Sequence, residues 1–176
     1  FEKKSSTKIT FLFVGRMLKE KGLIEFLKAS EIIKKKYSNA VFQILGNYDE
    51  RNPSSIDKNE LNYYVSNNYV KVNNFRENIT TLLIECDCVV LPSYREGMPK
   101  SILEGLSCGI PVVTTNTIGC KESILPGING ELVNVRDPID LANKIELLIK
   151  DNDKRLIYSI EARKFAKNNF DLKDVI

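Results

Sequence analysis

Two glutamates stand close together in a segment that directly follows a strongly apolar run. Glu96 and Glu104 are separated by seven residues in REGMPKSILE, and CVVLP comes just before that segment. Carboxylates are costly near an apolar core unless other groups pair with them. In a structural interpretation, Glu96 complements a helix dipole and Glu104 pairs with Lys100 at i, i+4, each contributing roughly a few tenths of a kcal/mol. In a functional interpretation, both carboxylates accept hydrogen bonds from ligand hydroxyl groups, and the residues alone leave both interpretations open.

Two permanent cations follow the first apolar run of the chain. The segment VGRMLKEKG places Arg16 and Lys21 after Gly15, and it contains neither the G-x-G-x-x-G dinucleotide fingerprint nor a P-loop. Both side chains are charged at pH 7 and could bind phosphate oxygens, Arg16 with its planar fork and Lys21 as a point charge. The alternative is that they are solvated surface charges, like Lys19.

A helix is predicted to begin inside the acidic segment. Pro99 suits the first position of a helix, so the free backbone N–H groups of Lys100 and Ser101 would face a ligand in front of it. Such groups, together with the aligned peptide dipoles, make helix N-termini into anion sites. One apolar stripe of this helix turns Glu104 away from the deepest packing, and it consists of Ile102, Leu103 and Leu106.

Strand-like apolar runs alternate with helical periodicity along the chain. The predicted strands lie at residues 9–14, 40–45, 69–72, 88–92, 111–115 and 130–135. The predicted helices lie at residues 23–36, 60–66, 79–86 and 99–108, followed by two more between about 139 and 169. This alternation predicts an α/β fold with a doubly wound, parallel, six-stranded Rossmann-like sheet. Ligands bind beyond the carboxyl ends of such strands, so the candidate loops are 15–22, 46–55, 73–78, 93–99 and 115–121.

The composition excludes several classes of protein. With 176 residues, 43% of them hydrophobic, the chain can bury the core of one domain, and its net charge of +3 is too small to indicate a nucleic-acid partner. Because it has no histidine, the chain cannot build Ser/His or Cys/His catalytic pairs, and its four cysteines lack zinc-like spacing. No segment resembles a signal peptide or is apolar for long enough to cross a membrane, and the core-like cysteines favour the cytoplasm.

One acidic string matches a metal-binding motif. DND at residues 151–153 has the Asp-x-Asp pattern that can hold a divalent ion. It lies between the two last predicted helices, where Asp and Asn commonly cap a helix start. We therefore predict a helix cap and no metal site.

Three linked segments resemble those of one enzyme family. They are VGRMLKEKG, ILGNYDERNPSSI, and LPSYREGMPKSILEGLSCGIPVVTTNTIGCKESI followed by GINGELV. They are similar to the donor-binding half of retaining glycosyltransferases of family 4, which have the GT-B fold. The similarity runs from about residue 9 to residue 170. It implies that residues 1–8 are a linker at the start of a fragment and that residues 9–176 form the C-terminal, nucleotide-sugar-binding domain.

The resemblance implies a role for each candidate residue. Arg16 and Lys21 would neutralise the donor diphosphate as the glycosidic bond breaks, and Glu96 would hold hydroxyls of the transferred sugar. Glu104 would bind the ribose. Other positions would contact the sugar (Gly97, Met98), the phosphates (Lys100, Ser101) or the base (Gly46, Phe75, Arg76), with Gly15 and Pro99 at the turns. Many relatives carry glycine where Pro99 stands, so one backbone donor is missing here.

The resemblance also implies the reaction and its partners. The full enzyme would transfer a hexose or N-acetylhexosamine from a nucleoside diphosphate, with uridine diphosphate expected, to a glycan or lipid-linked acceptor in bacterial polysaccharide biosynthesis. It would need no metal or other cofactor, because two cations and a helix N-terminus already face the diphosphate. An absent N-terminal domain of the same polypeptide would bind the acceptor and make any contact with the inner face of the membrane.

Two other functions fit the same fold. One is a non-catalytic nucleotide-binding module, in which a change of Glu96 would leave the turnover of the full-length protein intact. The other is a GT-B sugar-nucleotide epimerase. Such enzymes act with histidines and acids across the cleft, and this chain contributes no histidine, so the epimerase ranks below the transferase.

Overall fold

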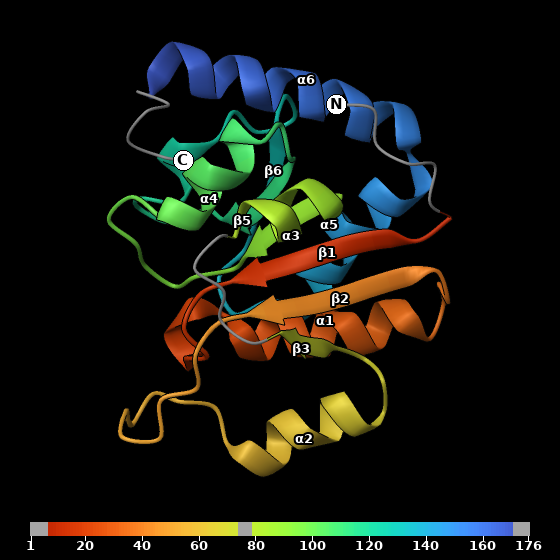
Figure 1. Ribbon diagram of the computed structural model, residues 1–176, viewed down its shortest axis with the longest axis vertical. Coiled ribbons are helices and arrows are strands. Elements are labelled where there is room, and N and C mark those ends of the chain that lie inside the picture. Colours follow the sequence, from red (N-terminus) through yellow and green to blue (C-terminus); the bar gives the residue numbers. More distant parts are fainter. Residues whose placement is uncertain (1–6, 74–78, 171–176) are drawn as a thin grey trace.

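Six apolar segments form one sheet within residues 7–73 and 79–170, which are the residues that this computed structural model describes (Figure 1). The strands are β1 (Ile9–Val14), β2 (Ala40–Leu45), β3 (Lys71–Asn73), β4 (Cys88–Leu91), β5 (Val112–Thr115) and β6 (Gly130–Val133). They lie in the order β3-β2-β1-β4-β5-β6, and every neighbouring pair is parallel. The predicted doubly wound, six-stranded parallel sheet is therefore confirmed.

Helices cover both faces of this sheet (Figure 1). They are α1 (Leu23–Lys34), α2 (Lys58–Ser66), α3 (Thr80–Glu85), α4 (Lys100–Ser107), α5 (Pro138–Lys150) and α6 (Asn152–Asn169), with short 3-10 turns η1 (Lys19–Lys21) and η2 (Lys121–Ser123). α1 packs against α5 on one face, and α4 packs against α6 on the other. Right-handed crossovers between parallel strands produce this two-sided arrangement.

Side-chain alternation along the strands decides which face each helix covers. Phe13 of β1 contacts Phe26 of α1, with ring centroids 5.5 Å apart. Leu12 alternates with Phe13 and pairs with Val89 of β4, so both point to the opposite face. Val89 lies against Gly105 of α4, where an added Cβ would be only 2.9 Å from its side chain. Glycine at this position therefore lets α4 approach the sheet closely.

The chain reverses its direction across the sheet at β1. This strand lies between β2 and β4, so the connections that leave β1 and β4 run to opposite sides. At such a switch point the two loops separate and leave a crevice outside the carboxyl ends of the strands. The loops at residues 15–22 and 92–99 occupy these positions, and both carry candidate site residues.

Two strands differ by two residues from the bounds that the apolar pattern predicts. The amides of Tyr69 and Val70 both bond the carbonyl of Tyr64 at the end of α2, so the ladder of β3 begins only at Lys71. The last strand ends two residues earlier than predicted, at Val133, because the next amide bonds a carboxylate of α5 at 2.8 Å. Hydrogen bonds to the ends of neighbouring helices thus use backbone N–H groups that the apolar pattern assigns to the sheet.

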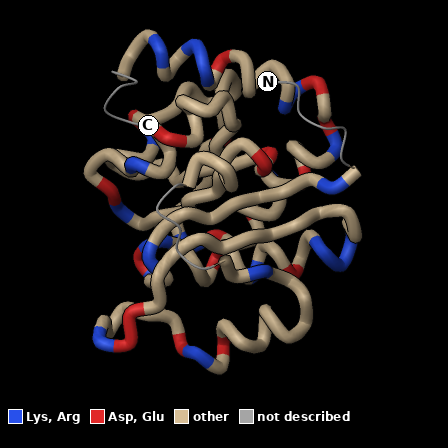
Figure 2. The backbone as a smooth tube through the Cα atoms, in the orientation of Figure 1, with Lys and Arg blue, Asp and Glu red and all other residues tan. Residues whose placement is uncertain are grey.

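Charged residues lie mainly outside the sheet. The strands β1, β2, β4 and β5 contain no Lys, Arg, Asp or Glu, and Figure 2 shows these residue types gathered on the helices and connecting loops. Cys86 and Cys88 are buried, which confirms that they pack in the core. Among the described helices, none combines the length and the apolar character needed to cross a bilayer.

The loop after β1 and the loop after β4 are in backbone contact at Gly22. This residue has φ +75°, in the left-handed region, and a Cβ built on it would overlap with the carbonyl group of Pro92. Only glycine satisfies both conditions without strain. The contact fixes the spacing between the two loops that carry the candidate site.

Gly22→Ala is expected to lower the free energy of unfolding by more than about 3 kcal/mol. The added methyl group would overlap with the carbonyl group of Pro92, and alanine would also be strained in the left-handed backbone conformation. Gly127→Ala is the matched control, since Gly127 also has φ +75° but no atom within 4 Å of an added Cβ. We expect the control to lose about 1–2 kcal/mol, the cost of the backbone conformation alone. Urea unfolding measures both losses, and equal values would contradict the contact.

Candidate functional site

An ion pair joins the loop after β1 to the loop after β4. The Lys21 ammonium lies 2.6 Å from Oε1 of Glu96, although the two residues are 75 positions apart in the chain. Their side chains are only 23% and 11% exposed, so water screens this pair less than it screens a surface pair. Two residues to which the family resemblance gives separate roles, at the diphosphate and at the sugar, are therefore in direct contact.

A serine that sequence reasoning did not consider completes this contact. Ser93 is buried, and its hydroxyl donates to the same Oε1 of Glu96 at 2.5 Å. The carbonyl of Ser93 in turn accepts a hydrogen bond from the hydroxyl of Thr115, at the end of β5. A serine three positions before a glutamate can form such a local bond, and that spacing was the available signal.

The loops after four strands adjoin one another at this edge of the sheet. A Cβ at Gly46, after β2, would overlap with the carbonyl of Gly15, after β1. The loop after β5 packs on the loop after β4, because Gly119 has φ +85° and a Cβ there would overlap with the carbonyls of Glu96 and Gly97. Gly119 is therefore a point of close backbone approach between these two loops.

The helix α4 begins at this edge with free backbone donors. Pro99 is its N-cap, with φ −74° and ψ 110°, and no side chain caps the helix. The prediction that Pro99 is the first helical residue is wrong by one position, because its ψ is extended. Within the described part of the chain, the amides of Lys100 and Ser101 have no hydrogen-bond acceptor. These donors and the helix dipole form a region that favours an anion.

Glu104 is half-buried one turn further along α4. Burial raises the pKa of its carboxyl group, and the charge of Lys100 offsets only part of that increase. No ion pair between Lys100 and Glu104 is found among the described residues, so Lys100 acts on this carboxylate through its charge and not through a direct contact. The predicted stripe is confirmed, since Ile102, Leu103 and Leu106 are buried.

The remaining candidates lie at the rim or outside the described residues. Arg16 is exposed directly after Gly15, so it can reach a ligand but is not held by a neighbouring side chain of the described chain. The Met98 side chain is 55% exposed beside Gly97, which has no atom within 4 Å of an added Cβ. The predicted base contacts at 75–76, Phe75 and Arg76, fall in the segment 74–78 that the structure does not describe.

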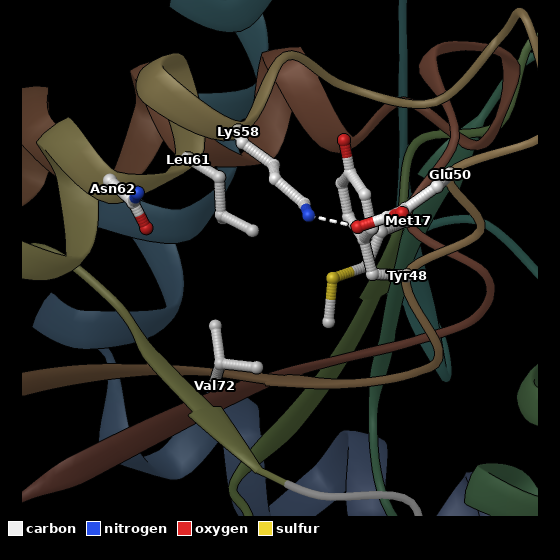
Figure 3. A pocket seen from close by; sticks show the side chains of 7 residues that line it. All are labelled: Met17, Tyr48, Glu50, Lys58, Leu61, Asn62 and Val72. Carbon is white, nitrogen blue, oxygen red and sulfur yellow. Dashed lines mark hydrogen bonds and ion pairs between the residues drawn. The ribbon is translucent and has the colours of Figure 1, made fainter.

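A pocket of about 500 Å³ lies close to these loops (Figure 3). It is on the face of the sheet that α1 covers, opposite to the face that α4 covers. Its lining residues come from the loops after β1 and β2, from α2 and from β3, and they are Met17, Tyr48, Glu50, Lys58, Leu61, Asn62 and Val72. Val72 pairs with Ile44 on the face that α1 covers, whereas Glu104 is on α4 across the sheet. Among the residues that the structure describes, none of the predicted site residues lines this pocket, so we treat the open edge, not the pocket, as the candidate site.

The structure offers no cluster of metal ligands in the part of the chain that it describes, where no three His, Cys, Asp or Glu side chains could hold an ion together. The DND string begins α6. Asp151 is its N-cap and accepts a hydrogen bond from the amide of Lys154 at 2.8 Å. The predicted capping role of this string is confirmed.

Comparison with known proteins identifies relatives over most of the chain. The family model described as glycosyl transferases group 1 matches residues 1–165. An N,N'-diacetylbacillosaminyl-diphospho-undecaprenol alpha-1,3-N-acetylgalactosaminyltransferase of Campylobacter jejuni is 37% identical over 145 residues, which are 82% of this chain and 36% of that protein. The capsular polysaccharide biosynthesis glycosyltransferase CapM of Staphylococcus aureus is 30% identical over 159 residues, which are 90% of this chain and 41% of that protein. The chain thus spans about two fifths of the length of these relatives.

Solved structures share the fold. The C-terminal domain of the glycosyl transferase group 1 family protein LpcC from Francisella tularensis has a TM-score of 0.84 at 24% identity, covering 93% of this chain and 87% of that one. HepE of Anabaena, in complex with UDP, has a TM-score of 0.85 at 25% identity, covering 96% of this chain and 46% of that one. The predicted likeness to one half of a GT-B fold is confirmed.

The buried contact between Lys21 and Glu96 should show a larger coupling energy than an exposed pair. A double-mutant cycle of Lys21→Met and Glu96→Gln, followed by urea unfolding, is expected to give about 1–2 kcal/mol. Lys35 and Glu31 supply the control, because they lie 2.7 Å apart but are 63% and 23% exposed. Their cycle should give a clearly smaller coupling energy, because water screens an exposed pair. Equal coupling in the two cycles would contradict the shielding described above.

Glu104→Gln should stabilise the chain at pH 7, because burial raises the pKa of Glu104 and so disfavours the ionised carboxylate in the folded state. As the pH falls through that raised pKa toward the ordinary value of 4.5, the folded carboxyl takes up a proton before the unfolded one does. The wild type then gains stability, and the advantage of the variant shrinks. Urea midpoints measured across this pH range test the sign, with the exposed Glu85→Gln as control.

Proposed function

The chain belongs to the glycosyl transferases group 1 family, and from this premise we propose that it is the donor-binding domain of a retaining glycosyltransferase of family 4. Residues 9–176 would form the C-terminal domain of a GT-B enzyme and bind a nucleoside diphosphate sugar, with UDP as the nucleotide. The transferred group would be a hexose or an N-acetylhexosamine. The observation that carries this proposal is the contact of Lys21 with Glu96 next to the uncapped start of α4.

That contact brings the predicted phosphate and sugar groups to one place. An ammonium has three donors, so Lys21 can bond Glu96 and still donate to a diphosphate. The free amides of Lys100 and Ser101 begin only a few residues after Glu96 and add the positive end of a helix dipole. A diphosphate at this edge would therefore meet a cation on one side and backbone donors on the other, with a carboxylate between them for sugar hydroxyls.

These groups suit the charge that develops during glycosyl transfer. When the glycosidic bond breaks, its electron pair goes to the leaving oxygen of the diphosphate, which becomes more negative. Arg16, Lys21 and the amides of α4 would stabilise that charge in proportion to its growth, which is the part of binding that accelerates a reaction. Glu104, half-buried on the same helix, would accept hydrogen bonds from the ribose hydroxyls. The proposed chemistry requires no metal ion or other cofactor.

The relatives support the class of donor and acceptor. HepE of Anabaena was solved with UDP and with UDP-glucose, and the Campylobacter jejuni relative is named for the transfer of N-acetylgalactosamine to a diphospho-undecaprenol acceptor. By analogy we propose a glycan or lipid-linked acceptor in polysaccharide biosynthesis. Because the relatives are more than twice as long, the acceptor site would lie on an N-terminal domain of the same polypeptide, at the cytoplasmic face of a membrane.

Calorimetric titration of the chain with UDP, uridine and pyrophosphate tests the donor site. Arg16→Ala should weaken UDP binding about tenfold through the loss of a charge-assisted hydrogen bond and leave uridine binding unchanged. Lys19→Ala, which removes an exposed cation from the same loop, is the matched control and should change neither. A chain that binds UDP no better than AMP would overturn the donor site. If Glu96→Gln left the turnover of the longer protein intact, the non-catalytic module would be the better description.

A further inference from the structure

We propose that Ser93 is a positioning residue that orients the carboxylate of Glu96 toward the transferred sugar. The inference rests on the proposed function, because it assigns a partner to a residue of the same site. Ser93 itself would touch neither sugar nor phosphate. It would act only through the oxygen of Glu96 that it holds.

The hydrogen bonds of Glu96 are unevenly divided between its two oxygens. Lys21 and Ser93 both donate to Oε1, at 2.6 and 2.5 Å. Within the described part of the chain, Oε2 has no hydrogen-bond partner. An ionised carboxylate offers about two acceptor sites on each oxygen. Oε1 is therefore occupied by the protein, while Oε2 keeps its full capacity for the hydroxyls of a ligand.

Two donors fix the carboxylate where one would not. Lysine has a flexible stem, so an ammonium alone could follow Oε1 as the carboxyl group rotates. Ser93 has a short side chain, is buried and lies two residues after the end of β4, so its hydroxyl has little freedom to move. Its bond and that of Lys21 together restrict the rotation of the carboxyl group. Groups fixed in this way lose little further entropy when a ligand binds.

Ser93 is in turn fixed by the sheet. Its carbonyl accepts the hydroxyl hydrogen of Thr115, the last residue of β5, and the Thr115 oxygen lies 3.0 Å from that of Thr117. Pro92, the preceding residue, is the one whose carbonyl faces Gly22. The backbone of residues 92 and 93 is thus in contact with β5 and with the loop after β1. Sites supported by regular elements hold their geometry better than sites supported by loops alone.

The sugar-dependent part of donor affinity is the readout that separates positioning from general stability. The chain is titrated with UDP and with UDP-glucose, UDP-galactose, UDP-N-acetylglucosamine and UDP-N-acetylgalactosamine. The sugar increment is the ratio of the UDP dissociation constant to that of the best UDP-sugar. Ser93→Ala should reduce this increment about tenfold and leave the dissociation constant of UDP within about twofold. In a Glu96→Gln background, Ser93→Ala should have no further effect on the increment.

Thr114→Val is the matched control. Thr114 is also buried at the end of a strand, and its hydroxyl donates to the carbonyl of Leu91 at 2.7 Å without touching Glu96. It should lose stability in urea unfolding but keep the sugar increment. A folded Ser93→Ala variant with an unchanged increment, or one that loses UDP and UDP-sugar affinity equally, would overturn the inference. Wild-type chain that binds UDP but gains nothing from any sugar would overturn it as well and leave the donor site standing, whereas absence of UDP binding would overturn the proposed function itself.

Discussion

The Glu96 side chain is only 11% exposed, and the ammonium of Lys21 lies 2.6 Å from one of its carboxylate oxygens. A charge that is mostly removed from water needs a partner with good geometry, and removal of that partner leaves the full desolvation cost behind. Here the partner comes from the other side of the switch point, on the loop after β1. The pair therefore links the two halves of the sheet where the chain order reverses. The same contact that holds the edge together also places a cation and an acid side by side.

Several features at this edge are unfavourable for stability and suited to a ligand. The helices α2, α5 and α6 begin with an aspartate that bonds backbone amides, whereas α1 and α4, which follow β1 and β4, have no side-chain cap. Glu104 is half-buried with a raised pKa and without an ion-pair partner in the described chain. Groups left in this state commonly mark functional sites, because a bound ligand can provide the missing partners. The edge at the carboxyl ends of the strands thus combines free backbone N–H donors with a partly buried acid, Glu104.

The pocket beneath α2 illustrates why concavity alone is a poor guide here. It lies on the face covered by α1, and the charged residues of the described chain that line it are an exposed ion pair, Lys58 and Glu50. The candidate site is an open edge instead, and a GT-B enzyme would complete its crevice with the second domain. The candidate site at the open edge and the pocket beneath α2 are therefore formed by different parts of the fold.

The sequence by itself determined the alternation of strands and helices, the parallel sheet and the capping of α6 by Asp151. Those results follow from local properties, namely side-chain period, turn residues and cap residues, which the chain carries wherever it folds. It also pointed to Glu96 and Lys21, but as residues with separate tasks. Only the tertiary structure decided that they are bonded to each other, that Ser93 shares the same oxygen, and that Gly119 and Gly22 allow the loops to meet. These facts depend on distances between segments as far as 75 residues apart in the chain, and the order of strands in the sheet, not the local pattern, sets those distances.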